Sequence, residues 1–218
     1  MSFITDELII TNKTEPIYSI LKNGVAYFFD ELNKYIEHND DSQILNYANE
    51  ITLSSLFLCG NIRQSSQITG VQEYGIDCIK GKKSFRGRPD IFMKSEKNAI
   101  WIECKFQKNT VTITNNHWDI GAWLLWDNQT ILQQLQDYYE AEKKMINSSF
   151  EKHYLVTLCF KLIRENKNQH LDLVQKKLRE ETKKLFISEW YYQVAFEESL
   201  TEICYGLEVY GTFKEEIV

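Results

Sequence analysis

The order of apolar patterns along the chain is the feature that most constrains its fold. Two segments in which apolar residues recur at helical spacing, beginning at Pro16 and Ser42, come before the first strand pattern. After Gly70, short runs rich in β-branched and aromatic residues alternate with turns and with two further helical patterns. Because such segments must bury their apolar faces together, the order predicts an α/β fold with a mixed central sheet flanked by helices.

The expected elements follow the order α, α, β, β, β, α, β, α, β. Helices are expected over about 16–37, 42–58, 128–145 and 171–186, and strands over 71–80, 90–93, 99–106, 153–162 and 190–196. Residues 81–88 are expected to form a basic turn or loop, and residues 95–98 a polar turn between two strands. We expect one domain over 1–218, with an N-terminal helical extension (1–41), a core (42–162) and C-terminal additions (163–218).

Composition and length exclude several classes of protein. Hydrophobic residues make up 43% of the 218 residues and only two are proline, so a disordered or collagen-like chain is excluded. The longest apolar runs, such as 122–126, are far shorter than a membrane span, and the N-terminus shows no secretory signal. The five cysteines form no C-x-x-C pair, as expected for reduced thiols. The sequence therefore predicts a cytoplasmic protein with no membrane partner.

The net charge of −6 is unevenly distributed. Residues 1–60 carry nine acidic and three basic residues, whereas the remainder is balanced. A local basic surface can still bind nucleic acid, because binding depends on where the charges lie. Five basic residues precede Asp90 within a nine-residue stretch, Lys80, Lys82, Lys83, Arg86 and Arg88. We interpret Lys82, Lys83, Arg86 and Arg88 as nucleic-acid-binding residues; the alternative is a solvated loop.

Charged residues at the ends of two apolar strands form the most informative constellation. Alternation along a strand places Glu103 and Lys105 on one face, and a hairpin through 95–98 can bring Asp90 beside Glu103. Two adjacent carboxylates repel, and a divalent cation relieves that repulsion. The lysine can position or help deprotonate a metal-bound water. Such a group suits phosphodiester hydrolysis; the alternative is a turn aspartate and a cross-strand ion pair on a solvated sheet edge.

The pattern Pro89-Asp90…Glu103-x-Lys105 resembles the PD-(D/E)xK nuclease superfamily, which includes many restriction enzymes and recombination nucleases. The resemblance implies a restriction-endonuclease-like core of order αβββαβ over about 43–162. It also implies that Asp90 and Glu103 bind the metal, that the Cys104 carbonyl can add a ligand, and that Lys105 assists the attacking water.

In this superfamily an acidic residue on the preceding helix often joins the site. Glu50 is the matching position and Glu73 is its rival, so the resemblance leaves both open. Gln134 and Tyr138 resemble the Q-x-x-x-Y pattern of the RecB-like branch, and residues 87–90 resemble its G-x-x-D pattern. Residues i and i+4 of a helix share a face, so both side chains could reach the pocket. The alternative for them is an ordinary helix surface.

The resemblance thus implies a Mg²⁺- or Mn²⁺-dependent nuclease that hydrolyses DNA with a metal-activated water, in defence, restriction or repair. The expected catalytic residues are Glu50, Asp90, Glu103, Lys105, Gln134 and Tyr138. We expect a homodimer or a subunit of a larger system. Two alternatives stay open: a nuclease acting on RNA, and a non-catalytic assembly module that docks a partner through residues 1–60.

Overall fold

The computed structural model describes most of the chain, in several stretches. The described residues are 3–39, 49–80, 83–111, 131–141, 143, 150–166, 169, 171–174, 176, 180, 189–198 and 203–217. They include helices α1 (Ile17–Asn39) and α3 (Glu50–Gln64) and helical residues over 131–141 and 171–174. None of the helices in these stretches is long and apolar enough to cross a membrane.

Eight of the described strands form a mixed sheet in which all pairs but one are antiparallel. The order is β1 (Phe3–Thr5), β9 (Trp190–Glu197), β10 (Ile203–Ile217), β8 (Lys152–Asn166), β7 (Asn98–Val111), β6 (Ile91–Ser95) and β3 (Ile68–Gln72), with β2 (Ile9–Ile10) also paired to β9. The parallel pair is β7 and β8. Parallel neighbours need a long crossover, and the helix over 131–141 lies within it.

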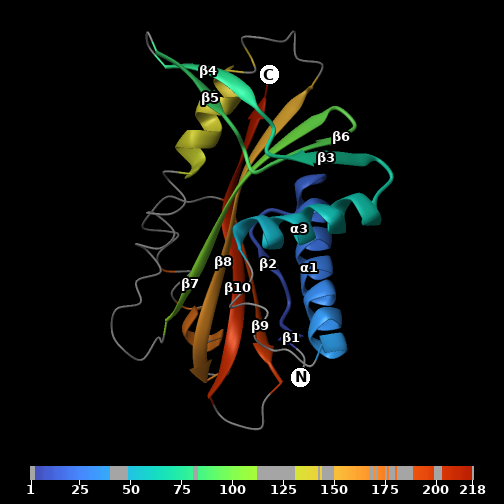
Figure 1. The fold of residues 1–218 in the computed structure, drawn as a ribbon, viewed down its shortest axis with the longest axis vertical. Coiled ribbons are helices and arrows are strands. Elements are labelled where there is room, and N and C mark those ends of the chain that lie inside the picture. The colour runs from blue at the N-terminus through green and yellow to red at the C-terminus, as the bar shows by residue number, and fades with distance from the viewer. Residues whose placement is uncertain are drawn as a thin grey trace.

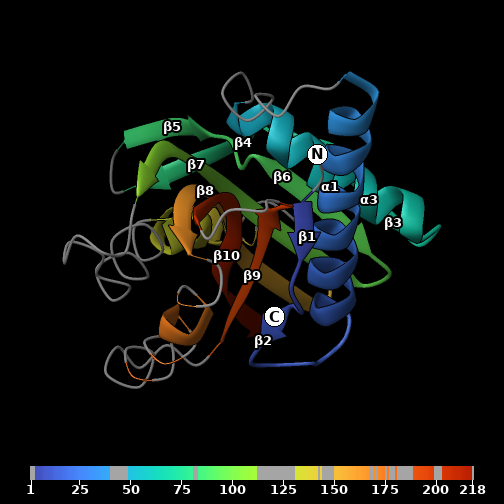
Figure 2. The same cartoon turned by 90° about the horizontal axis from the view of Figure 1, so that it is seen from below.

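Helices cover both faces of this sheet (Figures 1 and 2). Helices α1 and α3 lie on one face, and the helix over 131–141 lies on the other. Strand β7 packs against the helices on both faces of the sheet, because its successive side chains point to opposite faces. Ile100 and Ile102 join the core cluster that contains Phe28 and Phe57, whereas Trp101 packs in the cluster around Leu135. The prediction of an α/β fold with a mixed sheet flanked by helices is therefore confirmed.

The prediction of a single strand over 71–80 is wrong. Strand β3 ends at Gln72, and β4 (Ile76–Lys80) pairs with β5 (Lys83–Gly87) in a separate two-stranded sheet. Glu73 has φ 53°, a left-handed conformation that interrupts the extended backbone between β3 and β4. The basic loop expected over 81–88 is consequently largely strand.

The second helix also differs from its prediction. Within the described residues it begins at Glu50 and continues to Gln64, beyond the expected end at 58; residues 42–48 lie outside the described part. Gly60 lies inside α3, beyond the expected end of the helix. A Cβ there would lie 2.6 Å from the Tyr27 Cβ, so this glycine allows α1 and α3 to approach closely.

The remaining expectations divide into confirmed and missed elements. Strands expected over 153–162 and 190–196 lie within β8 and β9, and the described helical residues 131–141 lie within the expected 128–145. The expected helix over 171–186 is described as helical over 171–174, and much of the rest lies outside the described residues. Strands β1, β2 and β10 were missed.

Gly211 allows β10 to pack beside β8. A Cβ at this position would lie 1.9 Å from the Thr157 carbonyl oxygen, a contact that only a backbone shift can relieve. We expect Gly211→Ala to lower the free energy of unfolding by about 1–3 kcal/mol, as overpacking of a core does. Urea unfolding followed by circular dichroism measures this change.

Gly75→Ala is the matched control. There a Cβ would meet the end of the flexible Arg86 side chain, whose nitrogen is 2.7 Å away and can move into solvent. We expect a loss below about 0.5 kcal/mol, typical of a surface substitution. Equal losses in the two variants would contradict the packing argument.

Candidate active site

The hairpin of β6 and β7 places Asp90 against the middle of β7. Ile91 pairs with Ile102, so Asp90 precedes β6 at the level of Glu103 and Cys104. The Asp90 Oδ2 atom accepts a hydrogen bond from the Cys104 backbone N–H at 2.7 Å. The predicted hairpin is thus confirmed, and this hydrogen bond fixes the carboxylate of Asp90 to β7.

Glu103 and Lys105 lie on one face of β7, as strand alternation predicts. The Lys105 Nζ atom is 3.4 Å from Glu103 Oε1 and donates to the Cys104 carbonyl oxygen at 2.6 Å. The side chain of Glu103 is 7% exposed and that of Lys105 is 41% exposed. The carboxylate is therefore largely removed from water, whereas the ammonium reaches the surface.

Glu50 reaches the same group from the first turn of α3. The Asn49 side chain caps this helix by accepting a hydrogen bond from the Thr52 N–H. Glu50 Oε2 accepts a hydrogen bond from the Phe106 N–H at 3.1 Å, and Glu50 Oε1 lies 3.7 Å from Lys105 Nζ. The N-terminus of α3 is thus joined to β7 at the site.

Glu73, the rival position, lies at the periphery. It forms an ion pair with Arg88 at 3.3 Å, and its backbone N–H donates to the Asp90 carbonyl oxygen at 3.0 Å. Its side chain is 47% exposed. The structure therefore favours Glu50 as the third carboxylate, because Glu50 is the one that contacts Lys105.

The helix over 131–141 contributes Gln134 and Tyr138, which share one helix face as predicted. Gln134 Nε2 donates to Glu103 Oε1 at 3.1 Å, and the Tyr138 hydroxyl lies 2.5 Å from the same nitrogen. Tyr138 is 4% exposed. This contact orients the amide of Gln134 toward the buried carboxylate of Glu103.

The side chains of Glu50, Asp90, Glu103 and Lys105 shift one another's pKa values. Burial, and then the negative charge of Asp90, raise the pKa of Glu103 to about 7, although Lys105 acts in the opposite direction. Burial also raises the pKa values of Asp90 and Glu50. For Lys105, burial opposes the charged form, but the carboxylates of Glu103, Glu50 and Asp90 outweigh it, and its pKa is raised. Lys105 is therefore the counter-ion of a site rich in negative charge.

One acceptor of the group has no partner among the described residues. Glu103 Oε2 is buried and lacks a hydrogen bond, whereas Oε1 faces both Lys105 and Gln134. A buried acceptor without a partner is costly and marks a position for an added donor or cation. Within the same part of the chain, no group of three or more His, Cys, Asp or Glu side chains is arranged to hold a metal ion.

The predicted nucleic-acid-binding residues are described only in part. Arg86 and Arg88 have exposed side chains at the end of β5 and directly after it. Lys83 begins β5, but its side chain lies outside the described part, as does the whole of Lys82. Arg88 is two residues from Asp90, so the end of this basic segment adjoins the site.

Two buried charged residues on the same face were missed from the sequence. Lys161 and Glu208 are 4% and 0% exposed and are paired in register between β8 and β10. Lys161 is also paired with Gln107, two residues beyond Lys105 on β7. The Tyr192 hydroxyl donates to Glu208 Oε1 at 2.7 Å. The sequence signal that could have identified them is a single charged residue within an otherwise apolar strand.

No protein-family model, curated protein or solved structure matches this chain. The arrangement of its own side chains therefore carries the functional argument.

Glu103 makes stability depend on pH in a defined direction. Its pKa is higher in the folded state, about 7 against an ordinary 4.5, so the folded protein binds more protons between these values. Stability therefore falls as pH rises from about 4.5 to 7, by about 3 kcal/mol in total. We expect Glu103→Gln to be more stable than the wild type at pH 8 by up to about 3 kcal/mol, with no such gain at pH 4.5.

Denaturant unfolding of both proteins at pH 4.5, 6 and 8 measures this difference. Glu73→Gln is the matched control, because its carboxylate is half exposed and pairs with Arg88. A Glu103→Gln variant that is less stable than the wild type at pH 8 would contradict the interpretation.

Proposed function

We propose that the protein is a metal-dependent nuclease that hydrolyses phosphodiester bonds of DNA. The observation that supports this most is the convergence of Glu50, Asp90, Glu103 and Lys105 from three separate elements, α3, the start of β6, and β7. An ordinary ion pair on a solvated edge would not require a buried carboxylate with an unpartnered oxygen. The group matches what the PD-(D/E)xK pattern implies.

The proposed ligands of Mg²⁺ or Mn²⁺ are the carboxylates of Asp90 and Glu103 and the carbonyl oxygen of Cys104. All are oxygen donors, which these cations prefer. The unpartnered Glu103 Oε2 atom supports the assignment. Mg²⁺ commonly uses one or two protein carboxylates together with waters and substrate phosphate oxygens, so a cluster of three acidic ligands is not required.

A bound cation would supply Lewis-acid polarisation of the phosphodiester and favour ionisation of the attacking water. The protein would supply the positioning. Gln134 holds Glu103 Oε1, and Glu50 holds the ammonium of Lys105 beside the carboxylates. Lys105 then presents a positive charge where negative charge develops on the phosphoryl oxygens. Its partial exposure leaves the ammonium accessible to substrate.

The order of elements supports the proposed restriction-endonuclease-like core. Helix α3, strands β3, β6 and β7, the helix over 131–141 and strand β8 follow the order αβββαβ. The β4–β5 pair interrupts this order as an insertion between the first and second strands of the main sheet. We place the activity in DNA defence, restriction or repair, where such nucleases act.

The substitution test compares groups inside and outside the site. We expect Asp90→Asn, Glu103→Gln and Lys105→Ala each to reduce cleavage of plasmid DNA in Mg²⁺ or Mn²⁺ by about 10²–10⁴-fold, the usual range for charged catalytic groups. Glu50→Gln should reduce it by about 10-fold or more through loss of Lys105 positioning. A time course on agarose gels measures all variants.

Glu73→Gln is the control for Glu50→Gln, because both remove one carboxylate near the site. It should retain activity within about threefold. Cleavage that survives Asp90→Asn and Lys105→Ala would exclude this site. A folded wild type that cleaves neither DNA nor RNA in any divalent cation would favour the assembly-module alternative; cleavage of RNA alone would replace the proposed substrate.

Metal binding can be measured apart from cleavage. At pH 8, Mn²⁺ in 100-fold excess over its dissociation constant should stabilise the folded protein by about 2.7 kcal/mol, since the cation binds the folded state. The shift should be largely absent in Glu103→Gln and retained in Glu73→Gln. Thermal unfolding with and without EDTA tests this, and equal shifts in all three proteins would place the cation elsewhere.

A further inference from the structure

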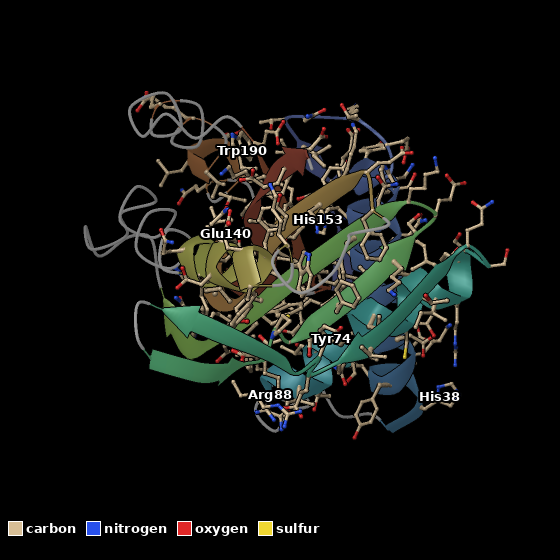
Figure 3. All side chains as sticks on the ribbon, turned by 90° about the horizontal axis from the view of Figure 1, so that it is seen from above. His38, Tyr74, Arg88, Glu140, His153 and Trp190 are labelled. Carbon is tan, nitrogen blue, oxygen red and sulfur yellow. The ribbon has the colours of Figure 1, made fainter. Side chains whose placement is uncertain are left out.

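The β4–β5 pair forms a ribbon that is separate from the main sheet. Its strands pair antiparallel from Ile76 with Gly87 to Lys80 with Lys83. The ribbon lies on the side of the helix over 131–141 (Figure 1), and Figure 3 labels Tyr74 and Arg88 near its base. In the described part of the chain, neither strand pairs with the main sheet.

The ribbon carries a strong local charge in a chain that is acidic overall. Residues 76–88 contain one acidic residue, Asp77, and five basic residues, Lys80, Lys82, Lys83, Arg86 and Arg88. Lys80 and Lys83 are directly paired across the two strands. A concentration of basic residues on one short ribbon favours a polyanion as its ligand.

The base of the ribbon is tied to the candidate active site. Arg88 pairs with Glu73, whose N–H donates to the Asp90 carbonyl oxygen. The Arg86 guanidinium packs over Gly75, where a Cβ would lie 2.7 Å from its nitrogen. A nucleic acid that follows the ribbon toward its base therefore reaches Arg88 and then Asp90.

The dimensions of the ribbon suit a duplex. Each strand has five residues, which span roughly 17 Å at about 3.4 Å per residue. The major groove of B-DNA is about 12 Å wide and admits a two-stranded β-ribbon. The ribbon can therefore cross the groove and contact phosphates on both of its sides.

Single-stranded DNA would need aromatic side chains on which bases can stack. Among the described aromatic residues near the site, Trp101 (0% exposed), Phe92 (4%) and Tyr139 (2%) are buried, and Phe106 is partly buried and packs against the core. Tyr74 is only partly buried, but its ring already stacks on Phe92 with centroids 4.7 Å apart. The described aromatic residues around the site thus offer no stacking platform.

We infer that the β4–β5 ribbon is an arm that binds the grooved surface of double-stranded DNA and directs the duplex toward Asp90. This inference rests on the proposed nuclease function and specifies its substrate as a duplex. The positive charges that Lys80, Lys83 and Arg86 add to the ribbon determine its affinity for the phosphates. They lie outside the catalytic group.

The test measures binding without cleavage. Fluorescence anisotropy in EDTA compares a labelled 30-base-pair duplex with the corresponding single strand, at several salt concentrations. The test variant is Lys80→Gln/Lys83→Gln/Arg86→Gln. The matched control, Lys13→Gln/Lys22→Gln/Lys34→Gln, removes the same charge from the three basic residues of residues 1–60. Thermal unfolding first establishes that both variants are folded.

We expect the ribbon variant to bind the duplex about 100-fold more weakly at 0.1 M salt, with the slope of log affinity against log salt reduced by about 2–3. The control should change by less than about threefold, and the duplex should be the preferred ligand of the wild type. Equal losses in the two variants, or a wild type that prefers the single strand, would overturn the inference.

The two proposals fail separately. If the protein cleaves DNA in a metal-dependent way but the ribbon variant binds the duplex as well as the wild type does, the proposed role of the ribbon is wrong and the nuclease proposal is retained. If the ribbon variant loses duplex binding but the wild type cleaves no nucleic acid, the proposed role of the ribbon is supported and the nuclease proposal is wrong.

Discussion

The antiparallel register of β6 and β7 is the constraint on which the candidate site depends. It sets Asp90 level with Glu103 and allows the hydrogen bond between the Asp90 carboxylate and the neighbouring Cys104 N–H. A slip of one residue would send Glu103 and Lys105 to the opposite face, toward α1 and α3. Ile100 and Ile102 are buried in the core cluster on one face of the sheet, and Trp101 is buried in the cluster on the other face. A slip would exchange these faces, so the packing of the three side chains prevents it. Packing of the sheet thus positions the charged group.

The same packing buries the carboxylate of Glu103, where its negative charge lowers the stability of the fold. Burial raises the pKa of Glu103 most, the neighbouring carboxylates of Asp90 and Glu50 raise it further, and Lys105 offsets only part of the increase. A protein selected for stability alone would favour an amide at this position. Retaining a carboxylate there is intelligible when a divalent cation supplies the missing positive charge. The pH dependence of stability and the proposed metal site are therefore two consequences of one electrostatic imbalance.

The parts of the site that are local in sequence could be predicted from the sequence. Asp90, Glu103 and Lys105 are joined by one hairpin, so alternation and a turn suffice to bring them together. The choice of Glu50 over Glu73 needed the docking of α3 on β7, a contact between residues 56 apart. The ribbon was missed because the left-handed backbone of Glu73 divides an apparently continuous strand, and glycines and charges disguised β10.

The most direct test of the account is a crystal structure determined with Mn²⁺, using its anomalous scattering to locate the cation. We predict an anomalous peak between Asp90 and Glu103, within coordination distance of Glu103 Oε2 and the Cys104 carbonyl oxygen. A crystal loaded with Mn²⁺ in which the cation binds elsewhere, with Lys105 still paired to Glu103, would contradict this prediction.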